Sequence, residues 1–385
     1  MRIKRINATN WRNFSSIEAE LGNRLFVVGP NASGKSNFLD IFRFLADVAK
    51  PGGGLASALE ERGGWSAVRN LNARNTNHGA VTIQVDLEDH DHQWSYLLTF
   101  RSEQAGNHRP IVSEEKVKRD GQVILNRPQT EDESDPELLT QTHLEQIASN
   151  RAFRPIADFF ASISYFHISP QAIRQANKGP KSDDPYGSGF LAAINATPEK
   201  TRNAWLDKIQ TALTAAVPDF ETLKLETDPS GQPHLIAGFK NWRKSPTHQN
   251  EAAFSDGTLR LIGLLWAVIS KSTTSGLLLL EEPEISLNAA IVRVLPSMLA
   301  TAQRGTTMQV VMTTHSPDLL DDEGIHPNEV LVLKVGDEST TASLLGQIDN
   351  PEAQALLAAP GLTNSDVVER LIDPIELRPL IQFSR

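Results

Sequence analysis

The sequence of 385 residues contains no cysteine, few tyrosines and methionines, and no long apolar segment. Without cysteine the chain cannot form a disulfide, a thiolate metal site or a cysteine nucleophile; it suits a reducing cytoplasm, where we expect it. The longest apolar stretch, Leu261–Ile269, is half of the ~18 residues that a transmembrane helix needs, so we expect no membrane association. The N-terminal segment is basic but lacks the apolar core of a secretion signal.

The chain is acidic overall, but its charge is unevenly distributed. It carries 37 Lys and Arg residues against 47 Asp and Glu residues, a formal net charge of −10. Residues 1–78 nevertheless carry eleven basic and six acidic side chains. Because phosphate binding depends mainly on basic groups, the acidic balance argues against a general nucleic-acid coat. A phosphate site is expected near the N-terminal end instead.

The hydrophobic patterns predict an α/β protein with an additional antiparallel sheet. Apolar strands are expected at Ile3–Ala8 and Leu25–Gly29, and a helix at Lys35–Ala49. Alternating apolar residues predict further strands in the segments Val81–Leu87, Trp94–Phe100, Ile111–Lys118 and Val123–Leu125. The acidic stretch Glu131–Glu137 is expected to be a solvated loop, and Ile163–Ile168 a buried strand. No heptad pattern is sustained, which argues against a long coiled-coil arm.

A phosphate-binding loop follows the second of these strands. The segment GPNASGKS, from Gly29 to Ser36, matches G-x-x-x-x-G-K-[ST] between an apolar strand and a helix. Gly29 and Gly34 would let the backbone wrap around a phosphate. Lys35 would reach the β and γ oxygens, and the Ser36 hydroxyl would bind Mg²⁺. The alternative, a glycine-rich turn without function, is disfavoured by the flanking strand and helix.

This loop predicts ATP and Mg²⁺ as cofactors. The residues expected to contact the nucleotide are those of the loop and of the first helical turn: Gly29, Pro30, Asn31, Ala32, Ser33, Gly34, Lys35, Ser36 and Asn37.

A second apolar strand ends in carboxylates. In the segment LLLLEEPE, from Leu277 to Glu284, the first carboxylate, Glu281, is placed to hold the metal ion or its water. Glu282 is then placed to act as general base on the attacking water. The alternative is that these acids only mark the N-terminus of the next helix, and Glu284 in particular fits that interpretation.

Two further segments fit a phosphate site. His315 ends the apolar strand that begins at Val310, where an imidazole could stabilise charge on the γ-phosphate, although a packed or solvated histidine is the plainer alternative. The segment FSDGTLR, which contains Ser255 and Gly257, opens an apolar helix. Its serine could simply cap that helix, or the helix end could bind a second phosphate.

Taken in order, GPNASGKS, FSDGTLR, LLLLEEPE and TTHS resemble the motifs of ATP-binding-cassette ATPases of the SMC and RecF branch. The sequence is more closely similar to the RecF/OLD-like ATPases of bacteria, which have a cassette head without arms. The resemblance covers nearly the whole chain. It implies one bilobed P-loop head with a peripheral antiparallel sheet and a short helical insertion. The parts would be residues 1–165, 166–250 and 251–385.

The resemblance also assigns roles to residues outside the loop. FSDGT matches the family's signature motif, so Ser255 and Gly257 would bind the γ-phosphate of ATP held by a second subunit. The protein would then form a head-to-tail homodimer that sandwiches two ATP molecules. His315 matches the switch histidine. Arg12 and Asn13 match a segment that lies near the adenine and the α-phosphate.

Other positions match the family less closely. The glutamine that joins the Mg²⁺ shell should follow the strand Ile163–Ile168, which makes Gln171 the first candidate and Gln175 the second. Asn288 stands where the D-loop usually has aspartate. Glu281 replaces the usual aspartate of the Walker B strand, and Ala32 replaces a common glycine of the P-loop.

The function expected from this resemblance is an ATPase whose dimerisation acts as a switch in DNA repair or anti-phage defence. The resemblance also implies a separate effector subunit, a nuclease or a toxin, as the partner; no nuclease motif is visible in the sequence itself. DNA is a further candidate partner, through the basic residues Arg2, Lys4, Arg5, Lys116, Lys118 and Arg119, although a solvated strand face explains the last three equally well. The alternatives are an ATP-binding scaffold with negligible turnover and, less favoured by the FSDGT signature, a transporter ATPase subunit.

Overall fold

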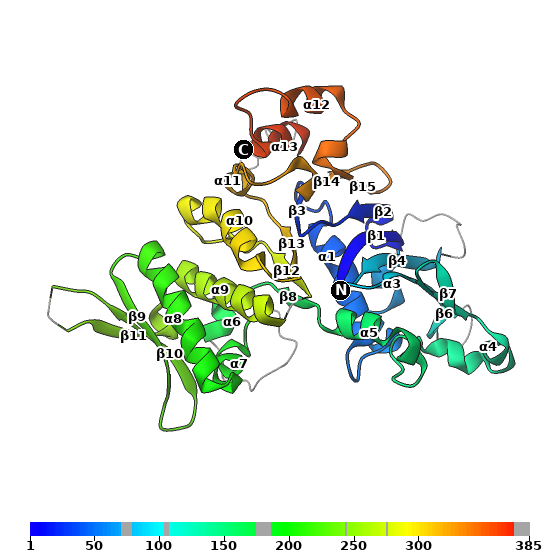
Figure 1. Cartoon of the computed structure of the whole chain (residues 1–385), viewed down its shortest axis with the longest axis horizontal. Helices are drawn as coiled ribbons and strands as arrows, with labels where there is room; N and C mark the ends of the chain where they lie inside the picture. Colours follow the sequence, from blue (N-terminus) through cyan, green and yellow to red (C-terminus); the bar gives the residue numbers. More distant parts are fainter. Residues whose placement is uncertain (71–78, 104–107, 175–185, 243–244, 275, 373–385) are drawn as a thin grey trace, which may run out of the picture.

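The computed structural model describes residues 1–70, 79–103, 108–174, 186–242, 245–274 and 276–372. Three sheets lie along the long axis of the molecule, with helices between and around them (Figure 1). The predicted mixed α/β head with a peripheral antiparallel sheet is confirmed. Among the described residues, no helix combines the length and apolar character needed to cross a membrane.

The peripheral sheet is antiparallel and comes mainly from the first third of the chain. Its order is β2-β1-β4-β5-β6-β7. The strands are β1 (Arg2–Trp11), β2 (Phe14–Glu20), β4 (Val81–Glu88), β5 (Gln93–Ser102), β6 (Pro110–Arg119) and β7 (Gln122–Arg127). Strict alternation of buried and partly exposed residues along β4 shows that one face packs on the core and the other meets solvent.

The central sheet brings together strands from distant parts of the sequence. Its order is β15-β14-β3-β13-β12-β8, in which only β15 is antiparallel to its neighbour. The strands are β3 (Arg24–Val28), β8 (Ser164–Phe166), β12 (Leu277–Glu281), β13 (Gln309–Thr313), β14 (Val330–Val335) and β15 (Thr340–Leu344). β8 is half-buried, and not fully buried as predicted, because it is an edge strand.

Alternate residues of the central strands pack into two separate hydrophobic cores. Leu279 and Val311 point into the core that the sheet shares with helix α1 and the peripheral sheet. Leu280 and Met312 point into the second core, which includes α9 and α10. Since successive strand residues point to opposite faces, a strand covered on both sides must be apolar throughout. This requirement explains the four consecutive leucines of β12.

The insertion contains a third sheet, antiparallel and in the order β11-β10-β9. Its strands are β9 (Phe220–Thr227), β10 (Pro233–Phe239) and β11 (Thr247–Asn250). With α7 and α8 it forms the side of the molecule opposite the peripheral sheet (Figure 1). The divisions at residues 165/166 and 250/251 stay predictions.

The helices cover both faces of the central sheet. They are α1 (Lys35–Ala49), α2 (Leu55–Glu60), α3 (Trp65–Val68), α4 (Thr130–Ser134), α5 (Arg154–Ala161), α6 (Pro170–Arg174), α7 (Phe190–Ala196), α8 (Glu199–Ala216), α9 (Asp256–Thr274), α10 (Ala289–Gln303), α11 (Pro317–Leu320), α12 (Pro351–Leu357) and α13 (Asn364–Ile372). The central helix α1 has the bounds predicted from its apolar spacing.

The acidic stretch at 131–137 is exposed except for Asp132, as its charge predicts, but it is helical and not a loop. It contains most of α4, followed by a 3₁₀ turn at Pro136–Thr140. Asp132 is buried and bonds the backbone N–H of Gln129, while Arg127 pairs with it at 2.7 Å. A capping box and a buried cation therefore give helical structure to a segment for which composition alone predicts a loop.

Candidate functional site

The P-loop leaves the carboxyl end of β3 and enters α1. Gly34 precedes the helix with φ 97°, a left-handed conformation that favours glycine. A Cβ at Gly34 would lie 2.3 Å from Asn13 Nδ2, and one at Gly29 would lie 2.6 Å from Ser33 Oγ. Ala32 also has a left-handed φ, 63°, where the family more often has glycine. The loop backbone is therefore held in a tight ring that only small residues permit.

The residues of the loop fit a nucleotide phosphate. Nζ of Lys35 donates to the carbonyl oxygens of Gly29 at 2.9 Å and Pro30 at 3.2 Å, so its amine points along the inside of the loop. Burial lowers the pKa of Lys35, while the nearby Glu282 acts in the opposite direction. Ser33 Oγ is buried and has no hydrogen-bond partner among the described residues. A buried hydroxyl without a partner inside a phosphate loop fits a ligand oxygen.

The segment Arg12-Asn13 supports the loop from outside. Asn13 Nδ2 donates to the Ser33 carbonyl oxygen at 2.9 Å and to Thr340 Oγ1 at 2.8 Å, and Asn37 Nδ2 donates to Asn13 Oδ1 at 2.7 Å. The guanidinium of Arg12 pairs with Asp40 of α1 at 2.7 Å. Arg12, Asn13, Ala32 and Asn37 line one shallow pocket with the turn between β14 and β15. These predicted nucleotide-binding residues are thus brought together.

Glu281 lies at the carboxyl end of β12, beside the P-loop. The hydroxyls of Ser36 and Tyr165 both donate to its carboxylate, and His167 Nδ1 lies 3.7 Å from its Oε2. Burial alone would raise the pKa of Glu281, but hydrogen bonds from His167, Ser36 and Tyr165 outweigh it and lower the pKa to about 2. The carboxylate is therefore anionic at neutral pH, as a metal ligand must be.

Ser36 and Glu281 lie close enough together to fit a shared Mg²⁺ ion. Mg²⁺ is usually held by one or two protein groups together with substrate phosphates and water. No cluster of three or more histidine and acidic side chains suited to a metal ion occurs in the described part of the chain. Ser36 and Glu281 are two protein groups of the kind that hold Mg²⁺ together with phosphate oxygens and water, so they fit a cation bound jointly with a nucleotide.

Glu282 and His315 meet at the ends of neighbouring strands. His315 Nε2 lies 3.1 Å from Glu282 Oε1. The pairing of β12 with β13 places Glu281 opposite Thr313, so the residues that follow both strands emerge at the same edge. Glu282 has a left-handed φ of 44°, and its N–H donates to Thr313 O at 3.2 Å. The structure thus brings together the two residues that the sequence analysis assigns to catalysis, and their roles stay predictions.

Glu284 is not an acid at a helix N-terminus, which was the simple alternative. It is buried, and α10 begins only at Ala289, where Asn288 caps the helix. Glu284 Oε1 accepts hydrogen bonds from the Thr314 hydroxyl at 2.7 Å and from the His315 N–H at 3.0 Å. Burial raises the pKa of Glu284 in spite of these bonds. Glu284 therefore fixes the backbone that presents His315.

Ser255 precedes α9 and Gly257 lies in its first turn, far from the P-loop in sequence. The Thr258 N–H donates to Ser255 Oγ at 3.1 Å, so the serine caps the helix, as one alternative held. Ser255 is itself exposed. A Cβ at Gly257 would lie 2.6 Å from the Ser286 carbonyl oxygen, which explains the glycine. Capping and phosphate binding use the same helix end and are compatible.

Gln171, the first candidate for the Mg²⁺ shell, bonds elsewhere. Its Nε2 lies 3.4 Å from Asp256 Oδ2, and its Oε1 accepts from Ser169 Oγ at 3.2 Å. The structure does not bring it into hydrogen-bond contact with Ser36 or Glu281. Its assignment to the metal stays a prediction, and Gln175 lies outside the described residues.

Sequence reasoning missed several residues of the site. Tyr165, in β8, donates a hydrogen bond to Glu281, and His167, just after β8, faces the same carboxylate. Their spacing of two was a usable signal, because such residues share one side of a strand. Arg260 is buried in α9 and donates to the Glu282 carbonyl oxygen at 3.3 Å. It carries no comparable signal, since its position depends on tertiary packing.

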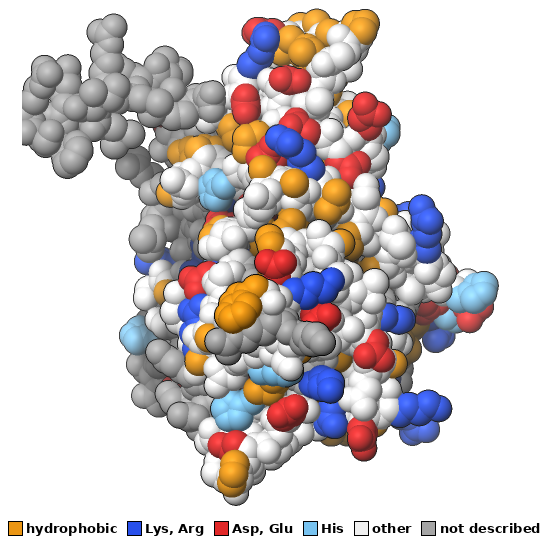
Figure 2. Space-filling view, turned by 90° about the vertical axis from the view of Figure 1, so that its left-hand side faces the viewer, with side chains coloured by type: hydrophobic (Ala, Val, Ile, Leu, Met, Phe, Trp, Pro, Cys, Tyr) orange, Lys and Arg blue, Asp and Glu red, His pale blue; other side chains and the backbone are white. Residues whose placement is uncertain are grey.

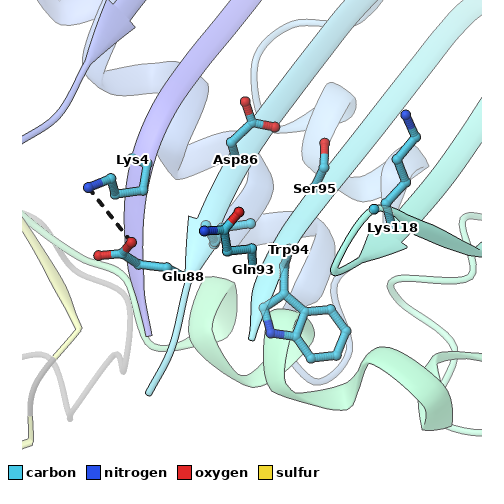
Figure 3. Close-up of a pocket in the computed structure, with 9 residues that line it drawn as sticks. Lys4, Asp86, Glu88, Gln93, Trp94, Ser95 and Lys118 are labelled. Carbon is cyan, nitrogen blue, oxygen red and sulfur yellow. Dashed lines mark ion pairs between the residues drawn. The ribbon is translucent and has the colours of Figure 1, made fainter. Parts of the chain in front are cut away.

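The basic residues proposed for DNA contact are partly neutralised. Arg2 and Lys4 both pair with Glu88, Lys4 at 3.7 Å (Figure 3), and Arg5 pairs with Asp86 at 2.8 Å. Lys4 and Lys118 border the same shallow pocket on the outer face of the peripheral sheet. Figure 2 shows the opposite side of the molecule, formed by the insertion, where acidic and basic side chains are interspersed over the visible described surface. Because Arg2, Lys4 and Arg5 are paired with carboxylates, these three residues add little net positive charge to the outer sheet face.

Comparisons with known proteins agree with this geometry. The structure resembles the SMC head domain from Thermotoga maritima, with a TM-score of 0.52 and 12% identity, over 91% of this chain and 100% of that one. It also resembles an SMC head bound to the C-winged helix domain of ScpA, with a TM-score of 0.52 and 12% identity, over 92% of this chain and 100% of that one. At this identity the likeness establishes the fold alone, and no curated protein matches the sequence.

The sequence itself matches a family over residues 25–321, from β3 to the end of α11. The match contains the P-loop, the signature segment, Glu281, Glu282 and His315. With the SMC-like fold it confirms the predicted ABC-type ATPase head. The chain belongs to the family described as "AAA domain, putative AbiEii toxin, Type IV TA system".

Proposed function

We propose that the protein binds and hydrolyses ATP, and that ATP joins two chains into a head-to-tail dimer. The observation that carries this proposal is the convergence at one sheet edge of Ser36 with Glu281 and of Glu282 with His315, beside the P-loop. Phosphoryl transfer to water uses groups of this kind. A P-loop serine and an anionic carboxylate can hold the metal ion, a second carboxylate can act on the attacking water, and a histidine can stabilise charge.

The chain's residues have separate tasks in this reaction. The P-loop N–H groups and Lys35 hold the β- and γ-phosphates. Mg²⁺, held by Ser36 and Glu281, would neutralise charge on the phosphate oxygens. Glu282 accepts a proton from a water whose oxygen forms a bond to the γ-phosphorus, while the bond from that phosphorus to the bridging oxygen breaks and ADP leaves. His315 donates a hydrogen bond to the γ-phosphate and stabilises the negative charge that develops on its oxygens.

Dimerisation would complete the site with the signature of a second copy. Ser255 is exposed at the N-terminus of a 19-residue helix, α9, where its hydroxyl and nearby N–H groups can meet a phosphate. Each chain would then lend its signature to the ATP held by its partner. The resemblance to the SMC and RecF branch supports this arrangement.

We further propose that the ATP-dependent dimer is a cytoplasmic switch that regulates a separate effector in anti-phage defence or DNA repair. The family description, with its toxin–antitoxin context, supports a defence role. DNA contact is restricted to local patches, because Arg2, Lys4 and Arg5 are paired with carboxylates. Lys116, Lys118 and Arg119 are the remaining candidates.

The hydrolysis proposal is tested by phosphate release from the wild type and from Glu282→Gln. Removal of a general base should lower turnover about 10²- to 10⁴-fold without weakening ATP binding. Glu323→Gln, a change at an exposed glutamate, is the matched control and should keep wild-type turnover. Equal rates for the wild type and Glu282→Gln would contradict the assignment and favour a scaffold with negligible turnover.

A further inference from the structure

The short helix α6 makes charged contacts with the signature segment. Arg174, its last residue, donates through Nη2 to the Phe254 carbonyl oxygen at 2.7 Å and pairs with Asp256 Oδ1 at 2.6 Å. Gln171, one turn earlier, places its Nε2 3.4 Å from Asp256 Oδ2. Two side chains of α6 therefore bind the residues that flank Ser255.

These contacts fix the backbone on both sides of the exposed serine. The Phe254 ring is buried and packs 6.4 Å, centroid to centroid, from Phe239 of β10. Ser255 Oγ lies 2.8 Å from Thr258 Oγ1 inside the first turn of α9. A guanidinium is a planar group with several donors, so it can hold a carbonyl and a carboxylate in one fixed geometry. Arg174 therefore links the two ends of the Phe254–Asp256 segment.

The contribution of Arg174 to folding should be small. Its side chain is 26% exposed and that of Asp256 43%, and ion pairs open to solvent contribute little to stability. Ile173 is fully buried and anchors α6 through apolar packing. The contact thus has more consequence for the position of Ser255 than for the stability of the fold.

The same stretch of chain also reaches the metal side of the site. Tyr165, in β8, donates to Glu281, and His167 faces the same carboxylate. Only the segment from 168 to 170 separates these residues from Gln171. One continuous stretch therefore contacts Glu281 at its beginning and Asp256 at its end.

We propose that Arg174 is a positioning residue that sets the signature of one chain for the ATP bound by a second copy of the chain. The inference rests on the proposed ATP-dependent dimer. Arg174 does not touch the nucleotide; it holds Phe254 and Asp256 so that Ser255 faces outward. Loss of the guanidinium should weaken the dimer and leave the binding of ATP to the single chain intact.

The test uses the full chain with Glu282→Gln, which should retain ATP, and adds Arg174→Ala, Arg174→Lys or Arg304→Ala. Two constants are measured: ATP affinity at protein concentrations too low for dimers, and dimer dissociation at saturating ATP by sedimentation. Arg174→Ala should raise the dimer dissociation constant about tenfold or more and change ATP affinity less than twofold. Arg174→Lys keeps the positive charge but lacks the planar guanidinium, so it should restore dimerisation in part. Arg304 is exposed and serves as the control.

The outcomes separate this inference from the proposed function. If the Glu282→Gln chain with intact Arg174 does not dimerise with ATP, the sandwich is wrong and the inference falls with it. If it dimerises and Arg174→Ala dimerises equally well, only the role of Arg174 is overturned. A parallel loss of ATP affinity in Arg174→Ala would also overturn it, because the residue would then act on its own chain's nucleotide.

Discussion

His315 Nε2 lies 3.1 Å from Glu282 Oε1, although 33 residues separate the two in sequence. The contact follows from the parallel pairing of β12 and β13, which ends both strands at one edge of the sheet. It joins the proposed base to the group proposed to stabilise the γ-phosphate. Whatever moves the segment after β13 therefore changes the surroundings of Glu282.

Glu284 provides the first test of this relationship. Glu284→Ala removes the acceptor of the Thr314 hydroxyl and the His315 N–H, and each buried donor without a partner costs about 1–3 kcal/mol. We expect kcat for ATP hydrolysis to fall about ten- to a hundredfold, with little change in KM, because a displaced His315 no longer faces the γ-phosphate. Steady-state kinetics measure both. Glu284→Gln keeps an acceptor oxygen and should retain most activity. If Glu284→Ala had no effect on kcat, the role of Glu284 in positioning His315 would be contradicted.

Asn13 should act on ATP binding and not on the chemical step. Asn13→Ala removes the hydrogen bonds that join the P-loop at Ser33 to Thr340 of β15. With about 0.5–1.5 kcal/mol for each bond, ATP affinity should fall about tenfold, as measured by calorimetric titration. Asn7→Ala, on the solvent face of the peripheral sheet, should bind ATP like the wild type. Unchanged affinity in Asn13→Ala would show that the loop does not need this support.

The buried pair of Arg127 and Glu115 predicts a large effect on stability. Both side chains are fully buried, and Glu115 also accepts the N–H groups of His143 and Leu144. Arg127→Met leaves Glu115 without its cation and should lower the free energy of unfolding by about 3–5 kcal/mol in urea titrations. Adding Glu115→Gln should recover part of that loss. A change below about 1 kcal/mol for Arg127→Met would contradict the role of the pair.

His234 predicts a pH-dependent contribution to stability. Its Nδ1 lies 2.8 Å from Glu251 and its Nε2 3.6 Å from Asp228, and Glu226 stands opposite on β9. The bond to Glu251 raises the pKa of His234 above its usual 6.5, against the effect of burial. This contribution is complete below pH 6.5 and is lost as the pH rises through the folded-state pKa. His234→Asn should therefore lower the free energy of unfolding, measured by urea titration, more at pH 6 than at pH 9. An equal loss at the two pH values would contradict the pH-dependent contribution of His234.

Local patterns predicted the parts of the fold that depend on nearby residues. The bounds of α1 follow from its apolar spacing and from Gly34 before it. The convergence of Glu282 and His315 was predictable because carboxylates and a histidine follow apolar strands of one parallel sheet. The order of the strands in the central sheet was not predicted, because it depends on pairing between segments far apart in the sequence.

Most of the missed features depend on which side chains meet after folding. Nothing near Glu284 indicates that Thr314 and His315 will bury it. Gln171 has the residue type and position expected for the metal shell, yet it bonds Asp256, because α6 packs against the start of α9. Composition gave the wrong prediction for the acidic stretch at 131–137, because Arg127 is a buried partner that no local pattern reveals.

The most direct test of the account is the assembly state of Glu282→Gln in sedimentation velocity experiments with ATP, ADP or no nucleotide. We expect ATP with Mg²⁺ to convert the monomer to a dimer, and ADP to leave it monomeric, because only ATP provides a γ-phosphate to join Lys35 of one chain to Ser255 of the other. Adding Lys35→Ala should abolish the conversion. The same sedimentation coefficient with ATP and ADP, or a dimer that persists with Lys35→Ala, would contradict the ATP-dependent sandwich.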